Sequence, residues 1–562
     1  MKNKIYLLLL TVMAFASQSC EDYLKEDLIS DVSSGTYYTT PQGFEDAVKA
    51  TYSWMKPHFS VEKGFTMSVF GTDTYSNGAD GSWKRYNLYN GDLNPSDGYA
   101  RDTWRDFYRG INQANATINR GAKIDGISES TKNQRLAEVR FLRALYYFVL
   151  VQTYGDVHLT LEETEGVELE ANRTAASEVY SQAIIPDLEF AISTLPDVQS
   201  NYGRATKPAA EGLLAKVLLT RSYKSYADGN DASRAEQLFS SVINNYDFKL
   251  LDDFSSLWDI NNEQNSEVVF AIQNSKSQVD EGLDNQGHRG HLYFLMEYDV
   301  LPGMTRDIAN GRPWKRFRPT PFLLSLWDRN IDARYDKTFK HAWYSNTAGN
   351  IPKWTQDDAS AGYVDASLVG QPKFEVGDTA VYIPGPGRDA EWPAARQARS
   401  RYLVYTSDEW DERRFPSLNK WIDDTRPDRQ KVEGQRDFIL MRLADVHLMR
   451  AEARLKQNNT TGAAEDINLI RRRGAWPGKE DANMITAADV TLDFILDERA
   501  RELVGEGHRW FDLVRTNKLV ERVRLHNAQA APNIQDFHVL RPIPQDQIDR
   551  TLGGYPQNPG YQ

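Results

Sequence analysis

The chain has 562 residues, of which 40% are hydrophobic, so it can bury a large core and its composition excludes a disordered protein. A net charge of −13 argues against a nucleic-acid-binding protein, because such proteins neutralise phosphates with an excess of lysine and arginine. A single cysteine excludes an internal disulfide, so packing must supply the stability.

The first 19 residues have the three parts of a secretory signal. Lys2 and Lys4 precede an apolar run over residues 5–16, and Ser17 and Ser19 follow it. This run is shorter than the ~20 residues that a membrane-spanning helix needs. Because Cys20 comes directly after it, we interpret Cys20 as the lipidated first residue of a bacterial lipoprotein. The two serines depart from the usual lipobox, so a cleaved signal peptide with an incidental cysteine is the alternative.

Helical periodicity dominates the next part of the chain. In residues 138–157 the apolar side chains recur every three to four positions, and Gly155 ends the pattern. Residues 176–195 are also predicted to be helical, with Pro186 as a bend or break. Residues 207–227 and 231–246 predict two antiparallel helices. Consecutive helix pairs with small residues against aromatic ones resemble degenerate tetratricopeptide repeats.

The helical periodicity is lost at about residue 250 and returns at about residue 435. Between these points Gly, Pro and aromatic residues are frequent, and only residues 266–273 and 378–385 predict short strands. Helices are then predicted over residues 437–457, 461–474 and 491–519. Within the last of these, Gly505 and Gly507 separate two helices, and Asp497 and Arg501 have the spacing of an ion pair on one helix face.

These changes divide the chain into four predicted parts. They are a signal peptide over residues 1–19, an N-terminal helical region over 20–250, a loop-rich ligand-binding layer over 251–435 and a C-terminal helical region over 436–562. The predicted fold class is therefore mainly α-helical, with an irregular layer and a few short strands.

Motifs of catalysis and metal binding do not match this sequence. It has no G-x-S-x-G nucleophile elbow and no H-E-x-x-H zinc motif. Residues 228–239 begin like a calcium loop, but Ala232, Ser233 and Phe239 stand where ligands or glycine are needed. We therefore predict no enzyme activity, no cofactor and no metal. An irregular calcium site formed by loop carboxylates stays an alternative. A hydrolase stays an alternative, because 79 acidic residues always place some carboxylates close together.

Four segments of the chain resemble recurring blocks of the SusD/RagB family. They are "AEVRFLRALYYFVLVQTYGDV", "RLADVHLMRAEA", "ILDERARELVGEGHRWFDLVR" and the terminal "LRPIPQDQI" followed by "QNPGY", and they occur in the order of the family. The same resemblance implies a scaffold of four tetratricopeptide-like helix pairs beneath a loop-rich layer.

The resemblance also implies a place and a function. Members of this family are surface lipoproteins through which Bacteroidota take up nutrients. The chain is accordingly expected on the outer face of the outer membrane, anchored through Cys20, as the lid of a SusC-like TonB-dependent transporter. Its expected cargo is an oligo- or polysaccharide. Two alternatives stay open, a peptide-capturing RagB-like relative and a scaffold that binds no small ligand.

Two loop segments have the composition of a sugar site, in which aromatic rings stack on sugar faces and planar polar groups bond hydroxyls. Residues 70–104 are rich in glycine, aromatic and charged residues, and the family places part of its glycan platform in this region. We predict that the following residues of this segment contact a glycan: Asp73, Trp83, Arg85, Tyr86 and Tyr89. The second cluster of the family lies in the middle layer, where Tyr298 and Trp314 are the candidates. Each of these aromatics could instead pack the loop onto the scaffold.

Overall fold

The computed structural model describes residues 37, 39–81, 83–164, 166–274 and 287–561. The predicted signal peptide and Cys20 therefore lie outside the described residues. Helices make up 46% of the structure and strands 7%, which confirms the mainly helical fold class. No helix within the described ranges has both the length and the apolar character that crossing a membrane requires.

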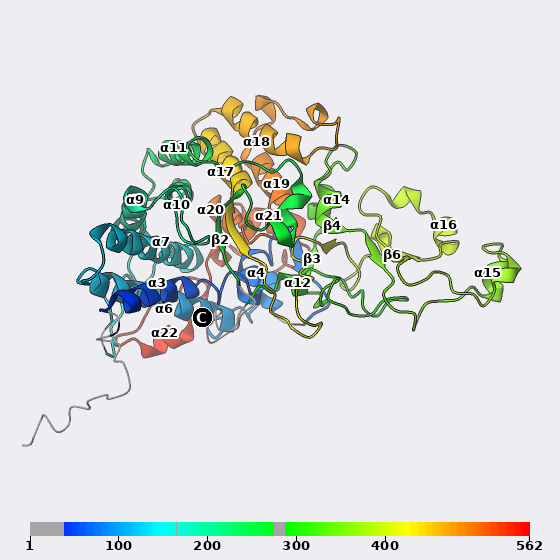
Figure 1. Ribbon diagram of the computed structural model, residues 1–562, viewed down its shortest axis with the longest axis horizontal. Coiled ribbons are helices and arrows are strands. Elements are labelled where there is room, and N and C mark those ends of the chain that lie inside the picture. The colour runs from blue at the N-terminus through cyan, green and yellow to red at the C-terminus, as the bar shows by residue number, and fades with distance from the viewer. Residues whose placement is uncertain (1–36, 38, 82, 165, 275–286, 562) are drawn as a thin grey trace, which may run out of the picture.

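The N-terminal helices pack side by side in antiparallel pairs (Figure 1). Helix α6 lies against α7, α7 against α9, and α10 against α11. These pairs are the repeat-like scaffold that the sequence predicted. The helices and the one strand of this part are α3 (Pro41–Ser53), α4 (Glu62–Ser68), β1 (Tyr75–Asn77), α5 (Arg85–Leu88), α6 (Gly98–Gly121), α7 (Glu129–Tyr154), α8 (Ala176–Val179), α9 (Ile185–Thr194), α10 (Lys207–Arg221) and α11 (Asp231–Asn244).

Helix α7 has well-defined signals at both ends. The Ser128 side chain accepts a hydrogen bond from the Thr131 amide, which satisfies one of the free N–H groups of the first turn. Gly155 ends the helix with a φ of 76°, a conformation that favours glycine. The helix predicted over 138–157 is thus confirmed, and it begins earlier, at Glu129. Its apolar side chains are buried because helices cover it on several sides.

Pro186 marks a break, as the sequence predicted. Helix α8 ends at Val179, a π-helical turn spans Tyr180–Ile184, and α9 begins at Ile185 with Pro186 in its first turn. Proline has no N–H to donate, and its ring clashes with the preceding turn of a regular helix. The wider π turn accommodates it without ending the helical path.

The middle layer consists of short elements joined by long loops. They are β2 (Val268–Ile272), α12 (Gly290–Tyr293), β3 (Phe317–Pro319), α13 (Pro321–Ser325), α14 (Arg334–Thr338), β4 (Phe339–Lys340), β5 (Ala342–Tyr344), α15 (Gln356–Ser360), β6 (Thr379–Tyr382), α16 (Ala394–Ala398), β7 (Leu403–Val404) and β8 (Ser417–Leu418). The two strands predicted over 266–273 and 378–385 correspond to β2 and β6. Strand β1 pairs with β3, and β4 with β8, both antiparallel.

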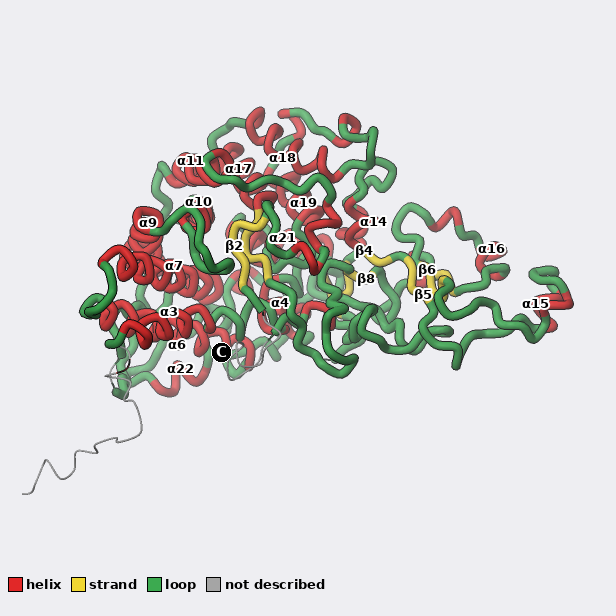
Figure 2. The backbone as a smooth tube through the Cα atoms, viewed as in Figure 1, coloured by secondary structure: helices red, strands yellow, loops and turns green. Residues whose placement is uncertain are grey.

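Part of this layer projects from the scaffold as an arm (Figure 2). The arm carries the three-stranded sheet β5–β6–β7 and the helices α15 and α16. It has a small core of its own, in which Tyr298, Trp343, Phe374 and Val381 are buried together. This separate core explains how an irregular segment keeps a defined shape so far from the scaffold.

The C-terminal region begins with a strand, and this corrects one prediction. Residues 437–457 were predicted to form one helix, but β9 (Phe438–Arg442) pairs antiparallel with β2 before α17 begins. A short buried apolar run fits a strand or a helix equally well, and only the partner strand decides. The helices that follow are α17 (Leu443–Lys456), α18 (Thr460–Gly474), α19 (Leu492–Glu502), α20 (Arg509–Arg515), α21 (Leu519–His526) and α22 (Gln545–Arg550).

Buried ion pairs join the C-terminal helices to the middle layer. The Arg442 guanidinium bonds the carboxylates of Glu267, Glu502 and Glu506 at 2.7–2.9 Å. The pair predicted between Asp497 and Arg501 is wrong. Arg501 bonds Glu498 at 2.8 Å instead, and Asp497 accepts from Arg522 of another helix.

Candidate functional site

Asp73 lies in the interior and not at a ligand surface. Its side chain is fully buried. Arg509 donates to both carboxylate oxygens, at 2.7 and 2.5 Å, and Arg522 donates at 2.7 Å. Burial alone would raise the pKa of Asp73, but the two guanidinium groups outweigh it and lower the pKa. The prediction that Asp73 contacts a glycan is therefore wrong, and the residue ties the 70–104 segment to α20 and α21.

Tyr86 and Tyr89 are also structural. Both side chains are buried, at 0% and 2% exposure. The Tyr86 hydroxyl donates to Asp97 at 2.6 Å, and the Tyr89 hydroxyl donates to the Gly71 carbonyl at 2.8 Å. These bonds hold the glycine-rich segment against the scaffold. The prediction of glycan contact is wrong for both residues, because each ring is needed to fold the loop that carries them.

Tyr298 belongs to the core of the arm. It is fully buried, stacks on Trp343 with ring centroids 4.5 Å apart, and donates to the Gly311 carbonyl at 2.6 Å. Its predicted contact with a glycan is therefore wrong as well. Four of the seven predicted glycan contacts are thus interior residues, and Trp83, Arg85 and Trp314 are the three that reach the surface.

Trp83 supports a second aromatic ring. Its indole stacks on Tyr99 with ring centroids 3.5 Å apart and planes inclined by 16°. The Arg85 guanidinium lies 4.4 Å from the same indole, and its Nε bonds Asp97. Two groups at these distances cannot share one face of a ring, so the indole is sandwiched between them. Trp83 therefore supports Tyr99 from behind, and Tyr99 is the ring that faces a hollow.

The hollow beside Tyr99 has a volume of about 250 Å³, and we call it the Tyr99 hollow. Helix α6 forms one wall, and α4 with the residues before it forms the other. Aromatic rings and charged groups line it together, as in sites for polar ligands with flat faces. Its main lining residues are Trp54, Glu62, Lys63, Tyr99, Asp102, Arg105, Asp106, Arg109 and Arg289.

The charges of the Tyr99 hollow are arranged in pairs. Lys63 donates to Asp106 at 2.6 Å, and Arg105 lies 3.0 Å from both Asp102 and Asp106. Burial lowers the pKa of Lys63, although Asp106 opposes this effect. Paired guanidinium and carboxylate groups of this kind can bond the neighbouring hydroxyls of a sugar without a net charge.

Trp314 is half-buried and does not line the Tyr99 hollow. It packs edge-on against Tyr293 at 5.7 Å, and the guanidinium of Arg316 lies 5.1 Å from its ring. Arg316 in turn pairs with Glu62, which lines the Tyr99 hollow. Tyr293 and Arg289 are also close enough to Tyr99 to influence its pKa, which burial raises. Trp83 contacts the hollow's Tyr99 directly and Arg85 contacts Trp83, whereas Trp314 is connected to the hollow only through Arg316 and Glu62.

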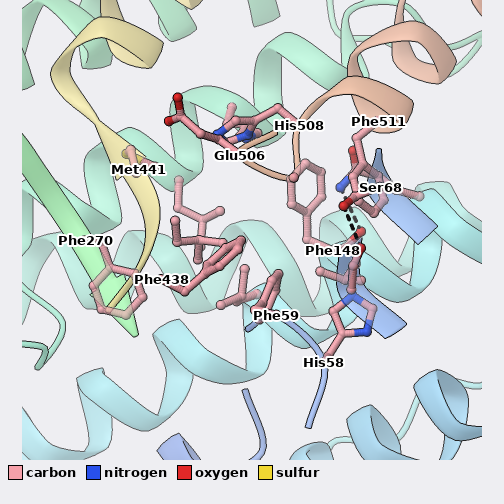
Figure 3. A pocket seen from close by; sticks show the side chains of 18 of the residues that line it. His58, Phe59, Ser68, Phe148, Phe270, Phe438, Met441, Glu506, His508 and Phe511 are labelled. Atoms are coloured by element: carbon pink, nitrogen blue, oxygen red, sulfur yellow. Dashed lines mark hydrogen bonds between the residues drawn. The ribbon is translucent and has the colours of Figure 1, made fainter. Parts of the chain in front are cut away.

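A separate cavity of about 70 Å³ lies inside the scaffold, between α7, α10, β9 and α20 (Figure 3). Its walls are mostly apolar, with Phe148 and Phe438 among them. His508 closes one side, where its Nδ1 lies 3.4 Å from Lys216 Nζ. Burial lowers the pKa of His508 to about 4, so the ring is neutral at pH 7. His508 immediately precedes Arg509, the first residue of α20, and its side chain makes no capping hydrogen bond.

Comparison with protein families matches two models to this chain. A model described as "SusD family" matches residues 219–561, which is more than half of the chain. The chain belongs to the SusD family. A second model, described as "Starch-binding associating with outer membrane", matches residues 22–219 of this SusD-family chain. The resemblance stated from the sequence is thereby confirmed.

Known relatives extend over nearly the whole SusD-family chain. The SusD-like protein P25 of Formosa agariphila is 25% identical and covers 97% of this chain and 98% of its own length. The starch-binding protein SusD of Bacteroides thetaiotaomicron is 24% identical over 78% of this chain and 75% of its own. A solved structure described as a laminarin-binding SusD-like protein has a TM-score of 0.67 at 24% identity, covering 93% of this chain and 100% of that one.

Sequence reasoning missed Tyr99, Arg105 and Arg289 in this SusD-family protein. Tyr99 is the second residue of α6, after the N-cap residue Asp97 and Gly98, so it lies in the first turn of the helix. Tyr99, Asp102, Asp106 and Arg109 recur at the spacing of one helix face, which was the available signal. Arg289 comes from a distant segment, and no local pattern connects it with α6.

Proposed function

We propose that this SusD-family protein captures a glycan at the Tyr99 hollow and does so without catalysis. The observation that carries the proposal is the Tyr99 ring, supported by Trp83 and facing a hollow lined by paired guanidinium and carboxylate groups. Aromatic rings stack on sugar faces, and such pairs bond hydroxyls. The names of the relatives, a starch-binding and a laminarin-binding protein, support a glycan as the cargo.

The non-catalytic reading is supported by the state of the carboxylates. Glycoside hydrolysis needs one carboxyl group that stays protonated as a general acid. Asp102, Asp106 and Glu62 of the hollow each lie in an ion pair with lysine or arginine, so their oxygens already have partners within the protein. Each stacking contact contributes ~1 kcal/mol, so we expect micromolar or weaker affinity for short ligands. Such an affinity lets the protein hold a glycan and release it again.

Anchoring and delivery complete the proposal. Cys20 would carry lipid that holds the protein to the outer face of the outer membrane, and the glycan would pass to a SusC-like TonB-dependent transporter. The family resemblance and the outer-membrane description of the matching model support this part. A Cys20→Ala variant should appear in the medium and not in the membrane fraction. Retention of this variant in the membrane fraction would contradict the anchor.

The capture site is tested by affinity electrophoresis of the chain from residue 21 onward. The gels contain uncharged polysaccharides (laminarin, starch, xylan and galactomannan) or charged ones (alginate, pectin and carrageenan). Tyr99→Ala is run beside Tyr344→Ala, whose ring is 57% exposed on the arm and far from α6. We expect retardation by at least one polysaccharide, lost in Tyr99→Ala and kept in Tyr344→Ala.

Each other outcome has a definite meaning. Retardation that persists in Tyr99→Ala would move the capture site away from the hollow. An absence of retardation in every gel would overturn glycan capture and favour the peptide-capturing or scaffold alternatives. New reducing ends in any polysaccharide after incubation would overturn the non-catalytic reading.

A further inference from the structure

A second and larger hollow lies on the adjoining face of helix α6. It has a volume of about 840 Å³, and we call it the α6–α22 groove. Its floor is one face of α6, where Arg101, Trp104, Tyr108 and Asn112 recur every three to four residues, and Gln113 lies beside this face. Residues 158–164 and 166–171 form one wall, and α22 forms the other, beside α6 in Figure 1.

The groove adjoins the Tyr99 hollow. Trp54, Arg105 and Arg109 line both of them. Arg105 and Arg109 are exposed, so their side chains can move aside without disturbing the core. From Tyr99 to Gln113 the two hollows follow about 20 Å of helix, at 1.5 Å for each residue. A ligand that extends from Tyr99 along α6 would therefore reach the groove beside Trp54.

The chemistry of the groove matches that of the Tyr99 hollow. Trp54, Tyr108 and His158 are half-buried, so part of each ring stays accessible, while amide side chains lie between them. Most guanidinium groups have carboxylate partners, since Arg101 and Arg105 contact Asp102. Arg550 likewise lies 3.7 Å from Asp546, whereas Arg109 lies over the ring of Trp54 at 5.8 Å.

We propose that the Tyr99 hollow and the α6–α22 groove form one track that holds the interior of a long, uncharged polysaccharide. This inference rests on the proposed function. It adds the class of polysaccharide and the part of the polysaccharide chain that is bound. A site that binds chain ends must be closed beyond the last sugar, whereas the Tyr99 hollow shares Trp54, Arg105 and Arg109 with a second hollow. Balanced ion pairs favour hydroxyl groups as partners over carboxylate or sulfate groups.

The test measures affinity against chain length by isothermal titration calorimetry. The probes are the polysaccharides that retard the protein in gels, each used as a long fraction and as its trisaccharide. Gln113→Trp fills the groove, and Gln182→Trp is the matched control on an exposed helical turn outside both hollows. We expect Gln113→Trp to weaken the binding of long chains about tenfold and to leave the binding of the trisaccharide unchanged. Tyr99→Ala should weaken the binding of both. Thermal unfolding of each variant confirms that it is folded.

The outcomes separate this inference from the proposed function. If Tyr99→Ala weakens binding but Gln113→Trp leaves long chains unaffected, the track is wrong and the capture site stands. Retardation by charged polysaccharides alone, or a tenfold loss of affinity between about 0.1 M and about 1 M salt, overturns the uncharged class. A lack of binding to every polysaccharide removes the proposed function and this inference together.

Discussion

Trp83 and Tyr99 form a parallel stack, with ring centroids 3.5 Å apart and planes inclined by 16°. Trp83 holds this position with a φ of 59°, a backbone conformation that is costly for a residue with a side chain. Arg85 covers the opposite face of the indole. The indole is therefore a rigid support, and the ring that it supports is the one that faces the hollow.

This stack predicts that Trp83 and Tyr99 act on ligand binding as one unit. Each single alanine variant should weaken the binding of the captured glycan about tenfold, and the double variant should weaken it by little more than that. Residues in direct contact share their interaction energy, so their effects are not additive, and an aromatic pair couples by about 0.5–1.5 kcal/mol. A calorimetric double-mutant cycle measures this coupling. Independent, additive losses would contradict the support role of Trp83.

Asp73 should matter for stability and not for glycan binding. Asp73→Asn leaves the buried guanidinium of Arg509 without its carboxylate partner and removes one of the carboxylates of Arg522, so we expect a loss of about 3–5 kcal/mol in the free energy of unfolding. Urea unfolding measures this loss. Asp493→Asn is the matched control, because Asp493 contacts the same Arg522 but is half exposed, and it should cost less than about 1 kcal/mol. A stable Asp73→Asn variant that fails to bind glycan would contradict the structural role.

Two carboxyl groups beside β9 predict a dependence of stability on pH. Burial raises the pKa of Glu263 from 4.5 to about 7 and that of Asp437 from 3.8 to about 6. The folded state holds these protons more tightly than the unfolded state. Their contribution is therefore fully present below pH 4 and is lost as the pH rises through 6 and 7.

Glu263→Gln tests this dependence, because the amide keeps an oxygen for Arg436 and cannot ionise. We expect the melting temperature of the unmodified chain to fall between pH 5 and pH 7.5 by more than that of the variant. Equal falls in both proteins would show that Glu263 does not titrate in this window.

The internal cavity predicts a stabilising substitution. Val149→Ile adds one methylene group toward an apolar space of about 70 Å³, and burying a methylene is worth about 0.8 kcal/mol. Val151 lies on the same helix, is equally buried and does not line the cavity. Val151→Ile should therefore overpack and destabilise the chain by about 1–3 kcal/mol. Chemical unfolding compares the two variants, and equal effects would mean that the cavity cannot accept the added group.

The helical scaffold could be predicted from the sequence because its signals are local. The apolar stripe of α7, the glycine at its end and the proline beside the π turn each act within a few residues. The failure at β9 has the opposite cause. Residues 438–442 are a strand because β2, far away in the chain, supplies their hydrogen bonds.

By itself, the sequence determined the family, the helical architecture and the segment that supplies part of the candidate site. Only the tertiary structure decided which residues of that segment face a ligand. Asp73 and Trp83 lie ten positions apart in similar glycine-rich surroundings, yet Asp73 is buried by Arg509 and Arg522, while Trp83 stacks under Tyr99 at the surface. Burial depends on partners hundreds of residues away, and composition within a loop carries no information about them.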